Sequence, residues 1–275
     1  MATPRAPLRF VEAVSATVSE STKSGFFFDY DGTIAPIMRD PAAVFPVAGA
    51  LARLEVLSNL VSRVAIVSAR PAAFLCDRFS GLPGVHLFGL YGMQTVVDGE
   101  VRTDADAQPW APVMRGLAAD AARELPGGVL VEDKALLVSL HYRAAPSLRT
   151  AVERWASGKA AELGLREQYG RMVVDLRPPV ERDKGTIIEH ETESLTRAWY
   201  FGDDLSDARA FDALRGRERR DPAFMGVAVA VANDEVGDEL IRGADFTAGS
   251  PEDVPAMLDH VIGAFPGPPA GSYAG

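Results

Sequence analysis

Two carboxylates lie two residues apart near the start of the chain, where Asp29 and Asp31 follow the apolar run Phe26-Phe27-Phe28. A short aromatic run bounded by glycines is typical of a strand buried on both faces, as in parallel sheets. If the strand geometry continues to its end, alternation puts both carboxylates on the same side of the sheet. Neighbouring negative charges disfavour joint ionisation, so we expect a cation beside them, and Mg²⁺ with oxygen ligands fits best.

Further polar residues occur at the ends of later predicted elements. Ser68 ends the second predicted strand, and Lys184 begins a helix, where a lysine and free backbone N–H groups can bind a phosphate together. Asp203, Asp204 and Asp207 follow a later strand. Singly, these residues are typical of caps, solvated charges or helix starts. Their succession along one edge of a sheet, where open α/β folds bind their ligands, is hard to assign to chance.

The elements that position these residues alternate between strands and helices. Strands are predicted at residues 25–28, 64–68, 86–90, 198–201 and 226–231, and helices at 10–20, 47–60, 71–79, from 184, 206–214, 235–242 and 251–265. This order predicts an α/β fold with a doubly wound parallel-sheet (Rossmann-like) core domain. A hairpin is expected at 93–102, turning at Asp98-Gly99.

The pattern changes near residue 105. A helix at 110–124, strands at 129–132 and 135–141, a helix at 146–163 and a strand at 171–176 describe a smaller α+β unit. We therefore expect a core domain at residues 1–105 and 180–275, with an inserted cap domain at 106–179. The arginine-rich segment 215–220 is interpreted as a solvated loop.

On these residues the sequence resembles the haloacid dehalogenase superfamily of phosphatases. The resemblance implies that Asp29 forms an aspartyl-phosphate and that Asp31 acts as general acid and then general base. It implies that Ser68 and Lys184 hold the phosphoryl oxygens, with Asp207 in a supporting role. The implied Mg²⁺ ligands are Asp29, Asp31 through its carbonyl, Asp203 and Asp204.

A narrower resemblance is to the trehalose-6-phosphate phosphatases. The segments that carry it are Asp29 to Pro36, Ile66 to Arg70, Gly89 to Gly92, Val131 to Lys134, His141 to Arg143, Asp175 to Pro178, Asp183 to Gly185 and Gly202 to Asp204. It implies hydrolysis of trehalose 6-phosphate, with the sugar hydroxyls bound by the cap. The implied substrate-binding residues are Glu132, Lys134, Arg143, Asp175 and Arg70.

Three positions depart from this family pattern: Ala69 stands for the usual Gly, Ser206 for Thr and Asp175 for Glu. Asp175 is one methylene shorter than Glu, which bears on sugar specificity. Two alternatives stay open. One is a related phosphatase for sucrose phosphate or a pseudo-disaccharide phosphate. The other is a non-enzymatic phospho-receiver module, which would need neither Asp31 nor a cap.

Composition narrows the partners and the location. The 275 residues carry a formal net charge of −10, which argues against nucleic acid as a partner. The single cysteine, Cys76, suits a reducing cytosol, and no signal peptide or membrane-spanning stretch is evident. We expect a cytoplasmic enzyme with a small sugar phosphate as its partner. The oligomeric state stays open, with a monomer favoured.

Overall fold

The computed structural model describes residues 8–38, 40–170, 172–232 and 238–266. The chain forms two compact units. Unit 1 holds the described residues of Met1–Val67, Asp77–Leu87 and Lys184–Gly275, and unit 2 holds those of Ser68–Cys76 and Phe88–Asp183. Residues 68–76 and 88–105 thus group with the insert. The predicted boundaries of the cap domain, at 105/106 and 179/180, therefore stay a prediction.

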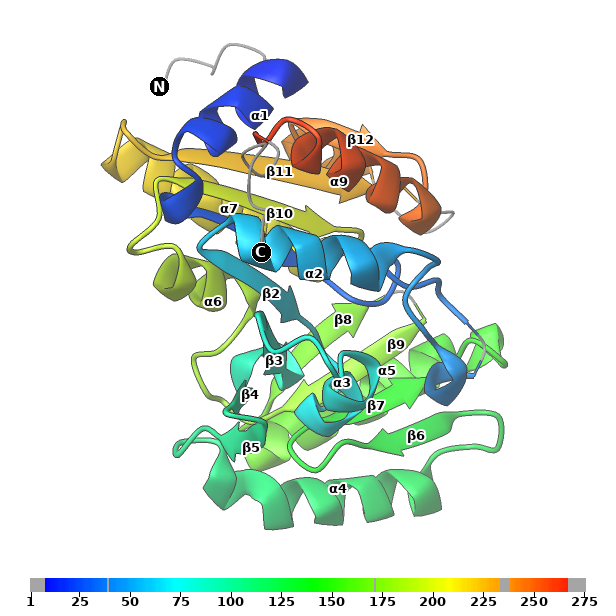
Figure 1. Ribbon diagram of the computed structural model, residues 1–275. Helices are drawn as coiled ribbons and strands as arrows, with labels where there is room; N and C mark the ends of the chain where they lie inside the picture. The colour runs from blue at the N-terminus through cyan, green and yellow to red at the C-terminus, as the bar shows by residue number, and fades with distance from the viewer. Residues whose placement is uncertain (1–7, 39, 171, 233–237, 267–275) are drawn as a thin grey trace. The chain divides into compact units, whose positions relative to one another are not determined.

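Unit 1 is built on a parallel sheet with the strand order β12-β11-β10-β1-β2 (Figure 1). Its strands are β1 (Ser24–Phe28), β2 (Arg63–Val67), β10 (Arg197–Gly202), β11 (Met225–Val231) and β12 (Phe246–Ala248). Its helices are α1 (Phe10–Ser19), α2 (Ala50–Leu60), α6 (Lys184–Glu191), α7 (Leu205–Arg220), α8 (Asp238–Gly243) and α9 (Val254–Ile262), with 3₁₀ turns at Ser21–Lys23, Pro41–Ala43 and Pro251–Asp253. The predicted doubly wound α/β core is confirmed.

Aromatic side chains fill both faces of this sheet. Trp199 stacks on Phe26 with ring centroids 5.4 Å apart, and Phe10 of α1 meets the Trp199 ring edge-on at 5.8 Å. Tyr200, the next residue of β10, meets Phe211 of α7 at 6.1 Å. Because successive strand residues point to opposite faces, α1 covers one face and α7 the other. The central strands are therefore buried on both sides.

Unit 2 contains a second, four-stranded antiparallel sheet with the order β6-β7-β9-β8. Its strands are β6 (Leu130–Asp133), β7 (Val138–His141), β8 (Arg166–Gly170) and β9 (Val173–Arg177). The unit also holds α4 (Ala111–Glu124), α5 (Arg149–Leu163), the hairpin β4 (Gln94–Val97) and β5 (Glu100–Thr103), and 3₁₀ turns at Leu90–Gly92, Gln108–Trp110 and Pro146–Leu148. Two elements, β3 (Val85–Gly89) and α3 (Ala72–Arg78), run from one unit into the other.

One face of the antiparallel sheet is covered by both helices of unit 2. Val138, Leu140, Val174 and Leu176 are fully buried on that face against apolar residues of α4 and α5. Ion pairs between Lys159 and Asp120 join the two helices at their surface. The opposite face of the sheet lies away from α4 and α5 and can therefore carry polar residues.

The predicted element order needs correction at three places. The strands β8 and β12 were not predicted, because β8 is almost entirely polar and β12 has three residues. The segment 215–220 is not a loop, since α7 continues to Arg220. Arg215 there donates to the Gly226 carbonyl at 3.0 Å and pairs with Asp245 at 2.5 Å, so it joins elements of unit 1.

Residue 171 of the strand predicted at 171–176 and residues 235–237 of the helix predicted at 235–242 lie outside the described residues. So do residues 267–275, for which the sequence predicts no helix or strand. Of the helices in the described ranges, none combines the length and the apolar character needed to cross a bilayer.

Candidate active site

Asp29 lies directly beyond β1, which ends at Phe28. Its backbone N–H donates to the Phe201 carbonyl at 2.9 Å, which holds Asp29 beside β10. The side chain is 6% exposed, and its Oδ1 lies 3.0 Å from Nζ of Lys184, the first residue of α6. These two residues, each expected at the same edge of the sheet, therefore contact each other.

Asp207 joins this pair from the first turn of α7. Its Oδ1 accepts from Lys184 Nζ and from the Tyr200 hydroxyl, each at 2.7 Å. Its Oδ2 accepts from the backbone N–H groups of Asp203 and Asp204, each at 3.0 Å. Four donors thus bind one fully buried carboxylate, so Asp207 positions Lys184 and the start of α7.

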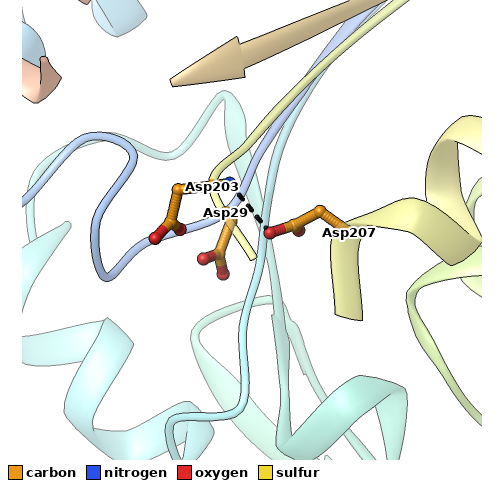
Figure 2. Close-up of side chains that lie close together, drawn as sticks. All are labelled: Asp29, Asp203 and Asp207. Atoms are coloured by element: carbon orange, nitrogen blue, oxygen red, sulfur yellow. Dashed lines mark hydrogen bonds between the residues drawn. The ribbon is translucent and has the colours of Figure 1, made fainter. Parts of the chain in front are cut away.

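Asp203 approaches Asp29 from the end of β10, and Figure 2 shows the carboxylates of Asp29, Asp203 and Asp207 gathered together. Thr33 donates to Asp203 Oδ1 at 3.2 Å. Gly32 has a φ of +80°, and a Cβ built there would lie 2.1 Å from Asp203 Oδ2. Only glycine permits both this left-handed turn and the close approach of the carboxylate.

Asp204 has a different role from its neighbour in this structure. Its Oδ1 caps α7 by accepting from the Ser206 backbone N–H at 2.8 Å and from the Ser206 hydroxyl at 2.6 Å. With Asp207 it forms a capping box. Among the described residues, the carboxylates of Asp29, Asp203 and Asp207 have oxygens within 4.8 Å of one another. The assignment of Asp204 as a metal ligand therefore stays a prediction.

The charge balance of this cluster calls for a cation. Burial raises the pKa of Asp29 to about 8, against the opposing charge of Lys184. Burial and the Asp29 charge also raise the pKa of Asp203. Burial alone would lower the pKa of Lys184, but Asp207 and Asp29 raise it, so the lysine stays charged. Three carboxylates against one lysine, with oxygen ligands only, fit a hard divalent ion such as Mg²⁺.

Asp31 lies in the turn that follows β1. The Tyr30 carbonyl accepts from the backbone N–H groups of Thr33, Ile34 and Ala35, and the Gly32 N–H donates to the Ala35 carbonyl at 2.7 Å. Asp31 is half-buried, and its charge contributes to the raised pKa of Asp29. Because β1 ends at Phe28, the turn rather than strand alternation positions Asp31.

In unit 2, the loop after β2 contacts the turn at residues 89–92. The Ser68 hydroxyl accepts from the Arg70 N–H at 3.1 Å, and the Ser68 carbonyl accepts from the Tyr91 N–H at 3.0 Å. A Cβ at Gly89 would lie 2.8 Å from the Arg70 carbonyl and 2.5 Å from the Ala72 nitrogen. Glycine at position 89 therefore lets the two segments meet.

Glu132 is the centre of a charged group on the antiparallel sheet. Its Oε2 lies 3.0 Å from His141 Nε2 and 3.3 Å from Lys134 Nζ. Burial alone would raise the pKa of Glu132, but the His141 hydrogen bond and the Lys134 charge, with a contribution from Arg70, lower it to about 2. The two predicted sugar-binding residues Glu132 and Lys134 thus lie together as an ion pair.

A row of four polar residues crosses the sheet on the face away from α4 and α5. Glu132 pairs in register with Ser139, Ser139 with Asp175, and Asp175 with Gln168. Register partners on neighbouring strands project to the same face, so these residues form one line, here called the polar row. Asp175 is 6% exposed and accepts from the Ser139 hydroxyl at 2.6 Å and the Tyr91 hydroxyl at 3.1 Å.

Three of the predicted substrate-binding residues lie outside the polar row: Lys134, which pairs with Glu132, and Arg143 and Arg70. Arg143 is exposed and follows β7 by two residues. Arg70 is 8% exposed, with its guanidinium 4.6 Å from the centroid of the Phe74 ring.

The sequence did not single out Tyr200, Tyr91, Ser139 or Gln168. Tyr200 belongs to an apolar strand. The residue that accepts from its hydroxyl, Asp207, lies seven residues away. Ser139 and Gln168 emerge only from strand register, and β8 itself has no apolar alternation. The signal for Tyr91 was its position between Leu90 and Gly92 in a segment already noted.

Comparison with known proteins shows which family the chain belongs to. The family model described as trehalose-phosphatase matches residues 27–248. The chain belongs to the trehalose-phosphatase family. It is 37% identical to the trehalose-phosphate phosphatase of Mycobacterium avium over 239 residues, which cover 82% of this chain and 58% of that protein. With that of Mycobacterium tuberculosis H37Rv it shares 33% identity over 256 residues, 86% of this chain and 60% of the relative.

The chain therefore spans less than two thirds of the length of these trehalose-phosphatase relatives. Solved structures show the same fold. The C-terminal domain of Candida albicans trehalose-6-phosphate phosphatase has a TM-score of 0.77 at 23% identity, covering 93% of this chain and 98% of that one. Trehalose-6-phosphate phosphatase of Aspergillus fumigatus has a TM-score of 0.65 at 21% identity, covering 93% and 98%.

Proposed function

We propose that this chain hydrolyses trehalose 6-phosphate to trehalose and phosphate, with Mg²⁺ as cofactor and Asp29 as nucleophile. The observation that carries the proposal is the buried contact of Asp29 with Lys184, at 3.0 Å, inside a group of three carboxylates. A carboxylate beside a fixed lysine can attack phosphorus while the lysine neutralises charge on the phosphoryl oxygens. Family membership supports the choice of substrate.

In the proposed first step, Asp29 attacks the phosphorus atom and the bond from phosphorus to the sugar oxygen breaks. Asp31 gives its proton to the departing alkoxide, so trehalose leaves as an alcohol. In the second step a water attacks the aspartyl-phosphate and gives its proton back to Asp31. Phosphate is released and Asp29 is regenerated as a carboxylate. Ser68 and Lys184 hold the phosphoryl oxygens in this proposal.

The proposed Mg²⁺ ligands are the carboxylates of Asp29 and Asp203 and the carbonyl of Asp31, with Asp204 as a further candidate. When bound, a divalent ion neutralises phosphoryl charge and favours the ionised form of Asp29. That second effect matters because burial raises the pKa of Asp29 to about 8, and only the carboxylate is a nucleophile.

The sugar is assigned to the polar face of unit 2. Glu132 and Asp175 can accept hydrogen bonds from hydroxyl groups, and Lys134 can donate them. A phospho-receiver would need neither this face nor Asp31, so both features favour an enzyme. The remaining alternative is a phosphatase for a different sugar phosphate.

Phosphate release from a panel of substrates tests the proposal. The panel holds trehalose 6-phosphate, sucrose 6-phosphate, glucose 6-phosphate and p-nitrophenyl phosphate, each with Mg²⁺ and with EDTA. The highest kcat/KM is expected for trehalose 6-phosphate, with turnover lost in EDTA. A higher kcat/KM for another sugar phosphate would overturn the substrate assignment. Acid quenching with labelled substrate should trap a phosphorylated protein in wild type and none in Asp29→Asn.

A further inference from the structure

Gln168 is a polar residue on β8. No role was predicted for it from the sequence, and it has none in the proposed function. It is half-buried and pairs in register with Asp175 of β9. Its neighbours on the same strand, Glu167 and Tyr169, both contact Ser157 of α5, at 2.7 and 3.3 Å. Because side chains alternate along a strand, Gln168 projects to the opposite face, which is the face of the polar row.

The side-chain amide of Gln168 differs from its neighbour in hydrogen bonding. Within the described ranges of the chain, no residue hydrogen bonds to this amide. Asp175 beside it is fixed by the hydroxyls of Ser139 and Tyr91. A carboxylate can only accept, whereas an amide can both donate and accept. Together the two side chains can bind adjacent hydroxyl groups, one donating to Asp175 and the other accepting from Gln168.

The polar row crosses all four strands of the sheet, and its two middle members, Ser139 and Asp175, are buried. Neighbouring strands lie about 4.8 Å apart, so the three steps from Glu132 to Gln168 span roughly 14 Å. That span is wider than a single hexose ring. Glu132 with Lys134 occupies one end of the row, and Asp175 with Gln168 the other.

We propose that Gln168 is a specificity-determining residue that binds a hydroxyl of the substrate sugar beside Asp175. The inference rests on the proposed function only in taking a sugar phosphate as the ligand. Gln168 takes no part in the chemistry, so it contributes to sugar affinity and leaves phosphoryl transfer unchanged.

The test compares two substitutions with a matched control. Gln168→Met keeps the length of the side chain and removes its polar atoms, and Gln168→Glu keeps an acceptor and removes the donor. Tyr169→Phe changes the next residue of β8, on the helix-covered face. Each variant is assayed for kcat and KM on the sugar phosphate preferred by wild type and on p-nitrophenyl phosphate, with thermal unfolding to compare folding.

Gln168→Met should lower kcat/KM for the sugar phosphate by about 3- to 10-fold, mostly through KM, because one neutral hydrogen bond is lost. Gln168→Glu should lose at least as much, and Tyr169→Phe should match wild type. Activity on p-nitrophenyl phosphate should stay the same in all three. An equal loss on both substrates, or no loss on either, overturns the proposal.

The same assay separates this inference from the substrate assignment. If wild type prefers a sugar phosphate other than trehalose 6-phosphate, the proposed function is wrong. The ratio of kcat/KM for Gln168→Met to kcat/KM for wild type is then measured on the preferred sugar phosphate. That ratio still supports or overturns the role of Gln168.

Discussion

The Tyr91 hydroxyl donates a hydrogen bond to Asp175 Oδ2 at 3.1 Å, while the Tyr91 backbone N–H donates to the Ser68 carbonyl at 3.0 Å. One residue thus connects the loop that carries Ser68 with the polar row of the sheet. Tyr91 and Leu90 both have left-handed φ angles, 57° and 48°, and Gly92 follows at 89°. Such a run is unfavourable for side-chain-bearing residues, so these hydrogen bonds hold it in place.

Tyr91→Phe should destabilise the protein, because it leaves the buried Asp175 carboxylate with one donor fewer. The expected loss in the free energy of unfolding is about 1–3 kcal/mol, measured by urea denaturation. Tyr169→Phe is the control, since that hydroxyl is on a residue 44% exposed and should change stability by less than about 0.5 kcal/mol. Equal stability of Tyr91→Phe and wild type would show that the Asp175 contact is dispensable.

Asp29→Asn should abolish turnover, because an amide cannot form an acyl phosphate. We expect kcat to fall at least about a thousandfold. The thermal stability of Asp29→Asn, unlike its kcat, should not fall. Burial disfavours the charged form of Asp29, so at pH 8 in EDTA the neutral variant should unfold at the same temperature as wild type or higher. Residual turnover near the wild-type rate would rule out Asp29 as the nucleophile.

Asp31→Asn should discriminate between leaving groups. A sugar alkoxide needs a proton to depart, whereas p-nitrophenolate leaves without one. In single-turnover experiments the phosphorylation step should therefore slow much more for trehalose 6-phosphate than for p-nitrophenyl phosphate. Equal slowing for both substrates would be evidence against Asp31 as the acid.

Mg²⁺ binding should be coupled to proton release. The folded-state pKa of Asp29, raised to about 8 from 3.8, means that the metal-free protein loses stability as pH rises from about 4 to 8. A bound cation favours the carboxylate and should reverse this loss. The apparent affinity for Mg²⁺, measured by calorimetry in buffers of different ionisation enthalpy, should therefore rise between about pH 6 and 8. A pH-independent affinity without proton release would contradict this prediction.

Glu132→Ala and Lys134→Ala should lower kcat/KM for trehalose 6-phosphate by one to two decades, because each charged hydrogen bond lost costs roughly 1.5–3 kcal/mol. Activity on p-nitrophenyl phosphate should be largely kept. Since the pKa of Glu132 is lowered to about 2, the effect of Glu132→Ala should not depend on pH above about pH 5. Asp120→Asn, in the α4–α5 ion pair on the covered side, is the matched control. A parallel fall for both substrates would indicate a structural role.

The sequence predicted the parts of the fold that burial dictates. Residues 26–28 of β1 and the whole of β11 are apolar because helices cover both faces of the parallel sheet. By contrast, β8 is polar because one face bears Gln168 and the other borders α5 near its exposed surface. The end of α7 was mistaken for a loop because the partners of its arginines are distant in sequence; Arg217, for example, donates to the Leu195 carbonyl at 2.9 Å. Such distant partners leave no local pattern.

The sequence predicted which residues lie at the candidate site better than it predicted what each of them does there. Asp29, Lys184 and Asp203 were recognisable at element ends. The engagement of Asp207 by Lys184, 23 residues away, depends on the tertiary fold, and the capping by Asp204 depends on the local backbone. No spacing rule distinguishes a capping aspartate from a metal-binding one in the segment Asp203 to Asp207.

The alternation along β7 and β9 has an evolutionary consequence. Ser139 and Asp175 project to the polar row, while Leu140 and Val174 beside them fill the apolar core under the helices. Substitutions in the row leave that apolar core in place, although the buried hydrogen bond between Ser139 and Asp175 constrains those two positions. Insertion of a single residue within either strand would exchange the two faces. Changes of length are thus expected only in the turns, while the strands change by point substitution.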